Sequence, residues 1–144
     1  MPRLERKVEI KSTPEKIYKI VTDGFNTPKW NPAVSSIVET ENKKFYLDTD
    51  LGGFTILNAE LEQDVSATWH LENSDISSIG YILTLKKGIS TDVAIWTEFD
   101  DKKQSKLFKQ MADQILVGLK NYAEFLEEGG DPEDFNKWKF ITPF

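Results

Sequence analysis

Hydrophobic and polar residues alternate along most of the first hundred positions, which is the pattern of strands with one buried face. The clearest run is at the end of this region, where one phase holds Thr91, Val93, Ile95, Thr97 and Phe99. Turn signals such as Asp50-Leu51-Gly52-Gly53 lie between runs. The predicted strands are 3–11, 33–40, 44–50, 54–62, 65–73, 78–86 and 89–99. Because gaps of hairpin size separate most of these runs, we expect an antiparallel sheet.

Two segments follow a helical period instead. Pro14 suits a first helical turn because its missing N–H would have no intrahelical partner there, and Thr13 can cap. Asp23-Gly24 then ends this short helix. A much longer helix is predicted over 102–127, ended by Gly129-Gly130. Its apolar residues recur at steps of three and four, namely Leu107, Phe108, Met111, Ile115, Leu119, Tyr122 and Leu126.

The loop after the first helix contains Pro28-Lys29-Trp30-Asn31-Pro32. The two prolines limit the segment between them to a turn or two. Trp30 is a single large aromatic residue in this tight segment, which indicates a plug or a lid.

This order of elements resembles the START-related helix-grip superfamily, also called SRPBCC. The similarity covers residues 3–128 and includes the Pro28–Pro32 segment and the Gly88-to-Thr91 turn into the last strand. It implies an α+β fold: a curved antiparallel sheet of about seven strands wraps around a long C-terminal helix, and two short helices follow strand 1. We therefore expect one helix-grip domain over 1–128 and an aromatic tail over 129–144.

In that family the space between sheet and helix is a ligand cavity, with the loop that carries Trp30 at its entrance. The resemblance implies that the cavity is lined by Trp30, Leu57, Ala59, Trp69, Tyr81, Leu83, Val93, Ile95, Met111, Ile115, Gly118, Leu119 and Tyr122. Each of these residues taken singly also fits an ordinary core. Gly118 lies inside the long helix, where glycine costs about 1 kcal/mol against alanine, so it makes room for a ligand or a close-packed strand.

Composition narrows the functional classes. A net charge of −6 with scattered lysines and arginines argues against nucleic acid, which needs a concentrated basic surface. No apolar stretch is long enough to cross a bilayer, and the first residues lack a signal-peptide core. The chain has no cysteine, which excludes disulfides and thiol nucleophiles and is compatible with a cytoplasmic location.

Catalytic candidates are few. His70 is the only histidine, which excludes a histidine-rich metal site, and we expect neither metal nor cofactor. Its strand phase places it opposite Trp69 and therefore on the outer face if Trp69 points inward. With the opposite register His70 would line the cavity as a general base.

Three functions follow from this reading. The first is binding or transport of a small hydrophobic or amphipathic, lipid-like molecule, without chemistry of the protein's own. The second is a polyketide cyclase or dehydratase, which requires a polar group such as His70 or Tyr81 in the cavity. The third is a protein-interaction module with a filled interior. The tail, 135–144, either folds back on the domain or forms a homodimer or partner contact, with Trp138 and Phe140 as first candidates.

Overall fold

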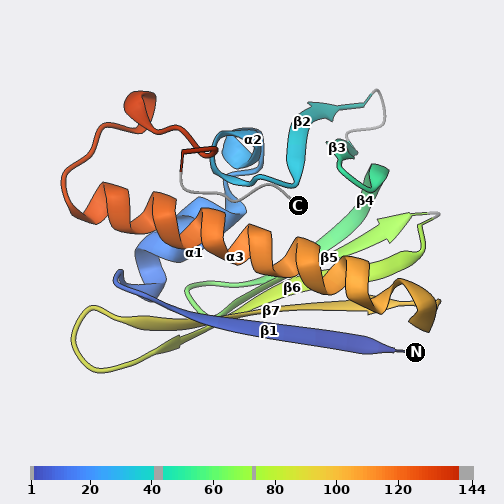
Figure 1. The fold of residues 1–144 in the computed structure, drawn as a ribbon, viewed down its shortest axis with the longest axis horizontal. Coiled ribbons are helices and arrows are strands. Elements are labelled where there is room, and N and C mark those ends of the chain that lie inside the picture. The colour runs from blue at the N-terminus through green and yellow to red at the C-terminus, as the bar shows by residue number, and fades with distance from the viewer. Residues whose placement is uncertain (1, 41–43, 73, 140–144) are drawn as a thin grey trace.

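The computed structural model describes residues 2–40, 44–72 and 74–139. Seven antiparallel strands form one sheet in the order β1-β7-β6-β5-β4-β3-β2, and a long helix, α3, crosses its concave face (Figure 1). The strands are β1 (Arg3–Ile10), β2 (Val34–Glu39), β3 (Phe45–Thr49), β4 (Gly52–Glu62), β5 (Ser66–Glu72), β6 (Ile76–Leu85) and β7 (Thr91–Phe99). The α-helices are α1 (Pro14–Thr22), α2 (Thr27–Trp30) and α3 (Ser105–Glu127), and the 3-10 turns are η1 (Gly24–Asn26), η2 (Lys102–Gln104) and η3 (Pro132–Asp134).

Among the described residues, three β-bulges interrupt the pairing of the sheet. Each places one extra residue in its strand: Ser35 in β2, Leu57 in β4 and Ser77 in β6. The hydroxyls of Ser35 and Ser77 donate to carbonyls of the neighbouring strand, at Asp48 (3.0 Å) and Glu98 (3.2 Å). A bulge bends its strand and increases local twist, so the three together favour a strongly curved sheet.

The inner face of the sheet holds the core. The phase predicted for β7 is confirmed, since Val93, Ile95 and Phe99 are almost fully buried. The β7 strand begins at Thr91 and not at Ile89, because Gly88 has a φ of 71° and the turn extends to Ser90. Strand β6 in turn begins two residues before the predicted Ser78, at Ile76.

The short helices form as the sequence predicts. Thr13 accepts a hydrogen bond from the Lys16 amide at 3.3 Å, and Pro14 occupies the first helical turn of α1. Helix α2 is a single turn that ends at Trp30, whose side chain is only 1% exposed. This segment packs against both β2 and α3.

Polar side chains attach helix α3 to β1 and to the start of α1. In the first half of the helix, Arg6 of β1 makes two hydrogen bonds with the Asp113 carboxylate, the shorter at 2.7 Å. Near its end, the Glu127 carboxylate accepts from the Ser12 hydroxyl (2.9 Å) and from the Lys16 ammonium (2.8 Å). These contacts fix the helix over β1 and α1 and leave the far end of the sheet, β2 to β4, less covered.

The described part of the tail folds back over the domain (Figure 1). Phe135 packs between Tyr122 and Phe125 of α3, with ring centroids 4.9 and 5.3 Å away. The Lys137 ammonium donates to three carbonyls between α2 and the start of β2, those of Pro28 (2.5 Å), Asn31 (3.0 Å) and Val34 (2.9 Å). Trp138 is 57% exposed, and Phe140 lies outside the described residues.

Candidate functional site

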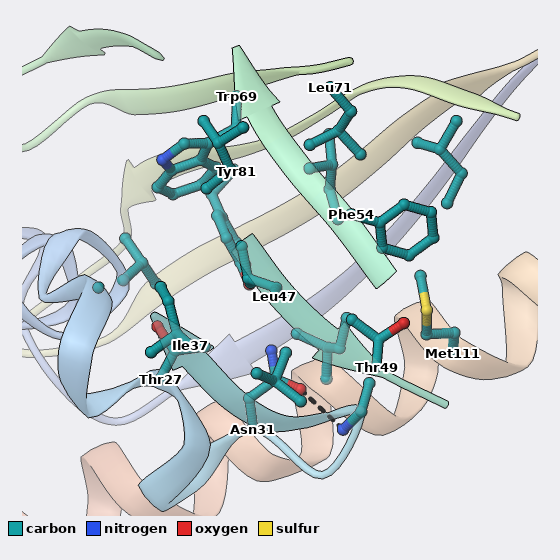
Figure 2. A pocket seen from close by; sticks show the side chains of 18 of the residues that line it. Thr27, Asn31, Ile37, Leu47, Thr49, Phe54, Trp69, Leu71, Tyr81 and Met111 are labelled. Carbon is teal, nitrogen blue, oxygen red and sulfur yellow. Dashed lines mark hydrogen bonds between the residues drawn. The ribbon is translucent and has the colours of Figure 1, made fainter. Parts of the chain in front are cut away.

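A cavity opens between the curved sheet, the α1–α2 segment and α3 (Figure 2). The space open to the centre of a water-sized sphere is about 130 Å³, whereas one water needs roughly 10–15 Å³ by the same measure. The walls come from the helices α1, α2 and α3, the turn η1 and the strands β2 to β6. The lining residues are Val21, Thr22, Gly24, Thr27, Trp30, Asn31, Ala33, Val34, Ile37, Leu47, Thr49, Phe54, Ile56, Trp69, Leu71, Ile76, Ile79, Tyr81, Met111 and Ile115. The cavity is therefore large enough for an organic molecule.

Five of the residues predicted to line a cavity do so. Trp30 comes from α2, Trp69 and Tyr81 come from β5 and β6, and Met111 and Ile115 come from α3. The Trp69 and Tyr81 rings meet edge to face, with centroids 5.8 Å apart. The structure thus brings together residues up to 85 positions apart in the chain, from Trp30 to Ile115.

The prediction for β4 is wrong at Leu57 and Ala59. Leu57 is the extra residue of the bulge and is 52% exposed, so the inward positions before it are Phe54 and Ile56. Ala59 pairs with Trp69 and shares its face, but it lies beyond the covered part of the sheet and is exposed. A bulge shifts the strand phase by one residue, and simple alternation misses that shift.

Other predicted lining residues are buried elsewhere. Leu83, Val93, Ile95 and Leu119 are at most 6% exposed and belong to the core between α3 and the sheet. Gly118 faces neither a ligand nor a strand: a Cβ built on it would lie 2.5 Å from both the Trp30 carbonyl oxygen and Pro32 Cδ. The glycine lets α3 approach the α2 segment.

Sequence reasoning missed the wall formed by β2, β3 and the first half of β4. It consists of Ile37, Leu47, Phe54 and Ile56, all half-buried. Their alternation was visible, but nothing in the sequence showed that the sheet curves enough to bring β2 and β3 over the cavity. Leu71 and Ile79 were in phase with Trp69 and Tyr81 and also belong to the lining.

Some polar side chains of the lining already make hydrogen bonds within the chain, and others do not. The Thr22 hydroxyl donates to the Tyr18 carbonyl and the Thr49 hydroxyl to the Gly52 carbonyl, at 2.6 and 2.7 Å. Asn31 accepts from the Ala33 amide through Oδ1 at 2.9 Å, shown as a dashed line in Figure 2. Burial raises the pKa of Tyr81, so its hydroxyl stays protonated at neutral pH. None of the described lining residues carries a charge.

Trp30 is a fixed part of the wall and not an exposed flap. Its indole N–H is buried and has no hydrogen-bond partner among the described residues. An unsatisfied buried donor costs about 1–3 kcal/mol, so this side chain is held by its packing and not by its polar atom. The gating role predicted for the Pro28–Pro32 segment remains a prediction.

Tyr122 lines a second pocket together with Trp30, Lys19, Ile20, Asp23 and Asn26. Burial raises the pKa of Tyr122, and the carboxylates of Asp23 and Glu133 act in the same direction. Trp30 lines both pockets, whereas Tyr122 lines the second pocket and not the main cavity.

His70 lies on the outer face of the sheet, the first of the two placements considered above. It pairs with Asn58 and Ser78, and its Nε2 lies 3.4 Å from the Glu60 carboxylate. It is therefore remote from the cavity lining. Within the described residues, no group of three acidic or histidine side chains is gathered to hold a metal ion.

Comparison with solved structures identifies the fold. A START superfamily protein from Mycobacterium smegmatis superimposes with a TM-score of 0.71 at 15% identity, covering 86% of this chain and 98% of that one. The Zhui aromatase/cyclase from Streptomyces sp. R1128 gives 0.72 at 10% identity, over 90% and 99% of the two chains. The Aha1 dimer protein from Colwellia psychrerythraea gives 0.66 at 18% identity, over 91% and 100%.

These matches confirm the predicted helix-grip fold of the START/SRPBCC type. No family model and no curated protein sequence matches the chain. No helix in the described part of the chain is long and apolar enough to span a membrane.

Proposed function

We propose that this protein binds a small, predominantly apolar molecule in the cavity between the sheet, α2 and α3. The observation that carries the proposal is an open cavity of about 130 Å³ walled mainly by carbon. Ligand pockets typically combine such a lining with a few placed polar groups. Each 100 Å² of apolar ligand surface that leaves water contributes about 2.5 kcal/mol before ordering costs.

A second candidate is an enzyme of the aromatase/cyclase type. One observation favours it: Tyr81 places a protonated hydroxyl in the cavity, which such an enzyme requires and which His70 does not supply. The similarity of this chain to the Streptomyces aromatase/cyclase is a similarity of fold. Binding without chemistry needs fewer groups and is therefore our first proposal.

The interaction module is less well supported than either. It requires a filled interior, whereas the cavity here is open. Of the tail residues suggested for a partner contact, Trp138 is exposed, while Phe135 and Lys137 contact the chain's own α3 and α2 segment. A homodimer through Trp138 is testable by light scattering on the wild type and on Trp138→Ala.

Native mass spectrometry tests the binding proposal, with the protein exposed to an apolar extract and then desalted. Ile56→Trp fills the cavity from its wall, while Thr55→Trp places the same side chain on the outer face of β4. We expect a stoichiometric adduct on the wild type and on Thr55→Trp, and none on Ile56→Trp. Adducts that survive in Ile56→Trp, or that form with none of the three proteins, would overturn the proposal.

A further inference from the structure

The cavity wall restricts the charge of its occupant. All twenty lining residues are uncharged at neutral pH, and the polar groups of their side chains are hydroxyls, one amide and the Trp30 indole N–H. An ionised group that leaves water without a partner of opposite charge costs several kcal/mol. A carboxylate or ammonium group is therefore excluded from the interior of the cavity, although it can remain at the opening.

Besides the buried indole N–H of Trp30, the polar side chains of Tyr81 and Asn31 have hydrogen-bonding capacity that the described residues leave unused. The Tyr81 hydroxyl makes no side-chain hydrogen bond to another described residue, although Tyr81 is only 6% exposed. Asn31 is 4% exposed and uses only its oxygen, toward the Ala33 amide. By contrast, the hydroxyls of Thr22 and Thr49 are bonded to carbonyls of their own segments.

The local chemistry fixes what these two groups can offer. The Ala33 N–H needs an acceptor, so the Asn31 oxygen must face it and the amide nitrogen, Nδ2, is left over. That nitrogen can only donate. The Tyr81 hydroxyl is protonated, because burial disfavours its anion, and it can donate as well.

Tyr81 and Asn31 come from opposite walls. Tyr81 extends from β6 on the sheet side, and Asn31 follows α2 on the other side (Figure 2). Resting on the proposed binding function, we infer that Tyr81 and Asn31 form a two-donor site for a carbonyl oxygen of the ligand. The ligand class is an uncharged, mainly apolar ketone, ester or quinone-like molecule.

Two uncharged solvatochromic probes test this site. Prodan is an aromatic ketone whose emission moves to the red when its carbonyl accepts a hydrogen bond, whereas N-phenylnaphthylamine is an apolar aromatic without a carbonyl. The decisive variant is Tyr81→Phe, which removes only the hydroxyl. Thr22→Val is the matched control, because it removes a hydroxyl of the same cavity wall that the Tyr18 carbonyl already engages.

We expect Tyr81→Phe to weaken Prodan binding about threefold to tenfold and to shift bound Prodan emission to the blue, the fold-change being that of one hydrogen bond. N-phenylnaphthylamine affinity should stay within about twofold in both variants. Thr22→Val should leave Prodan emission unchanged. Asn31→Asp keeps an oxygen that can accept from the Ala33 amide and replaces the donating amide nitrogen by a second oxygen. This variant should lower the affinity for Prodan more than the affinity for N-phenylnaphthylamine.

The outcomes separate the two proposals. If both probes bind the wild type and Tyr81→Phe changes neither the affinity nor the emission of Prodan, the two-donor site is wrong while the binding function stands. If neither probe binds the wild type, the proposed function fails first. Equal losses of both probes in Tyr81→Phe would indicate a change of cavity shape and would also overturn the two-donor site.

Discussion

Gly118→Ala tests whether the close approach of α3 to the α2 segment holds the cavity wall in place. In an ordinary helix interior, replacing glycine by alanine stabilises the helix by about 1 kcal/mol. Here the added methyl would lie 2.5 Å from the Trp30 carbonyl oxygen, 2.5 Å from Pro32 Cδ and 3.1 Å from Pro32 Cγ. Ordinary contacts begin at 3.4 Å, and neither a backbone oxygen nor a proline ring can rotate aside.

The magnitude follows from these two opposing effects. Overpacking a tight contact costs about 1–3 kcal/mol, and we take the upper half of that range because the obstacles are rigid. After subtracting the gain in helix propensity, Gly118→Ala should destabilise the fold by about 1–2 kcal/mol. For a chain of this length that corresponds to a melting temperature lower by roughly 3–6 °C.

Equilibrium urea unfolding followed by circular dichroism measures the effect. Val117→Ala is the control, since it introduces alanine one residue earlier at a position that is 41% exposed. We expect the control to be as stable as the wild type within about 0.5 kcal/mol. A Gly118→Ala protein more stable than the wild type would refute the reasoning, because helix propensity would then outweigh the contact.

Three further substitutions probe the wall, the tail and the helix attachment. Trp30→Ala should lower the free energy of unfolding in urea by about 3–5 kcal/mol, because the side chain is only 1% exposed. A free energy of unfolding unchanged within about 1 kcal/mol would contradict the structural role of Trp30 and would favour the gating role predicted from the sequence. Lys137→Met removes the ammonium that donates to three carbonyls and should speed amide exchange in residues 27–34 and 131–139, whereas Lys109→Met, on the exposed side of α3, should not. Identical exchange in wild type and Lys137→Met would count against the contact. Hydrogen bonds from Lys16 and Ser12 hold the pKa of Glu127 below its usual value of 4.5, so the stability that they contribute is present above pH 4.5 and is lost as the pH falls through the lowered pKa. Glu127→Gln should therefore reduce the loss of unfolding free energy as the pH falls below 4.5, and Glu128→Gln is the control. If the free energy of unfolding depends on pH as steeply in Glu127→Gln as in Glu128→Gln, Glu127 is not the responsible group.

Much of the fold could be predicted because local signals and overall topology agree. The cap at Thr13, the phase of β7 and the period of α3 each depend on neighbouring residues, and the first two are confirmed. The period of α3 holds from Phe108 to Tyr122, but Leu107 of the predicted apolar face is 46% exposed, and residues 102–104 form a 3-10 turn before the helix. The order of segments then left few architectures open, and the helix-grip fold was the one observed.

The cavity lining was harder to predict because it depends on curvature. Trp69 and Tyr81 lie where the sheet meets the α1–α2 segment, while Val93 and Ile95, equally inward in phase, lie under α3 and are fully buried. Alternation tells which face a side chain occupies, but not which part of that face the helix covers. Gly118 shows the same limit, since its partner, the Trp30–Pro32 segment, is more than eighty residues earlier in the chain.

The bulge at Leu57 has a consequence for insertions and deletions. Ile56 pairs with Leu71, Asn58 with His70 and Ala59 with Trp69, so removing Leu57 would leave every one of these pairs and faces unchanged. A deletion in a regular strand reverses all the side chains that follow it, whereas this deletion would only straighten β4. The residue is thus dispensable for pairing, and its loss would alter the shape of the cavity without replacing any residue of its lining.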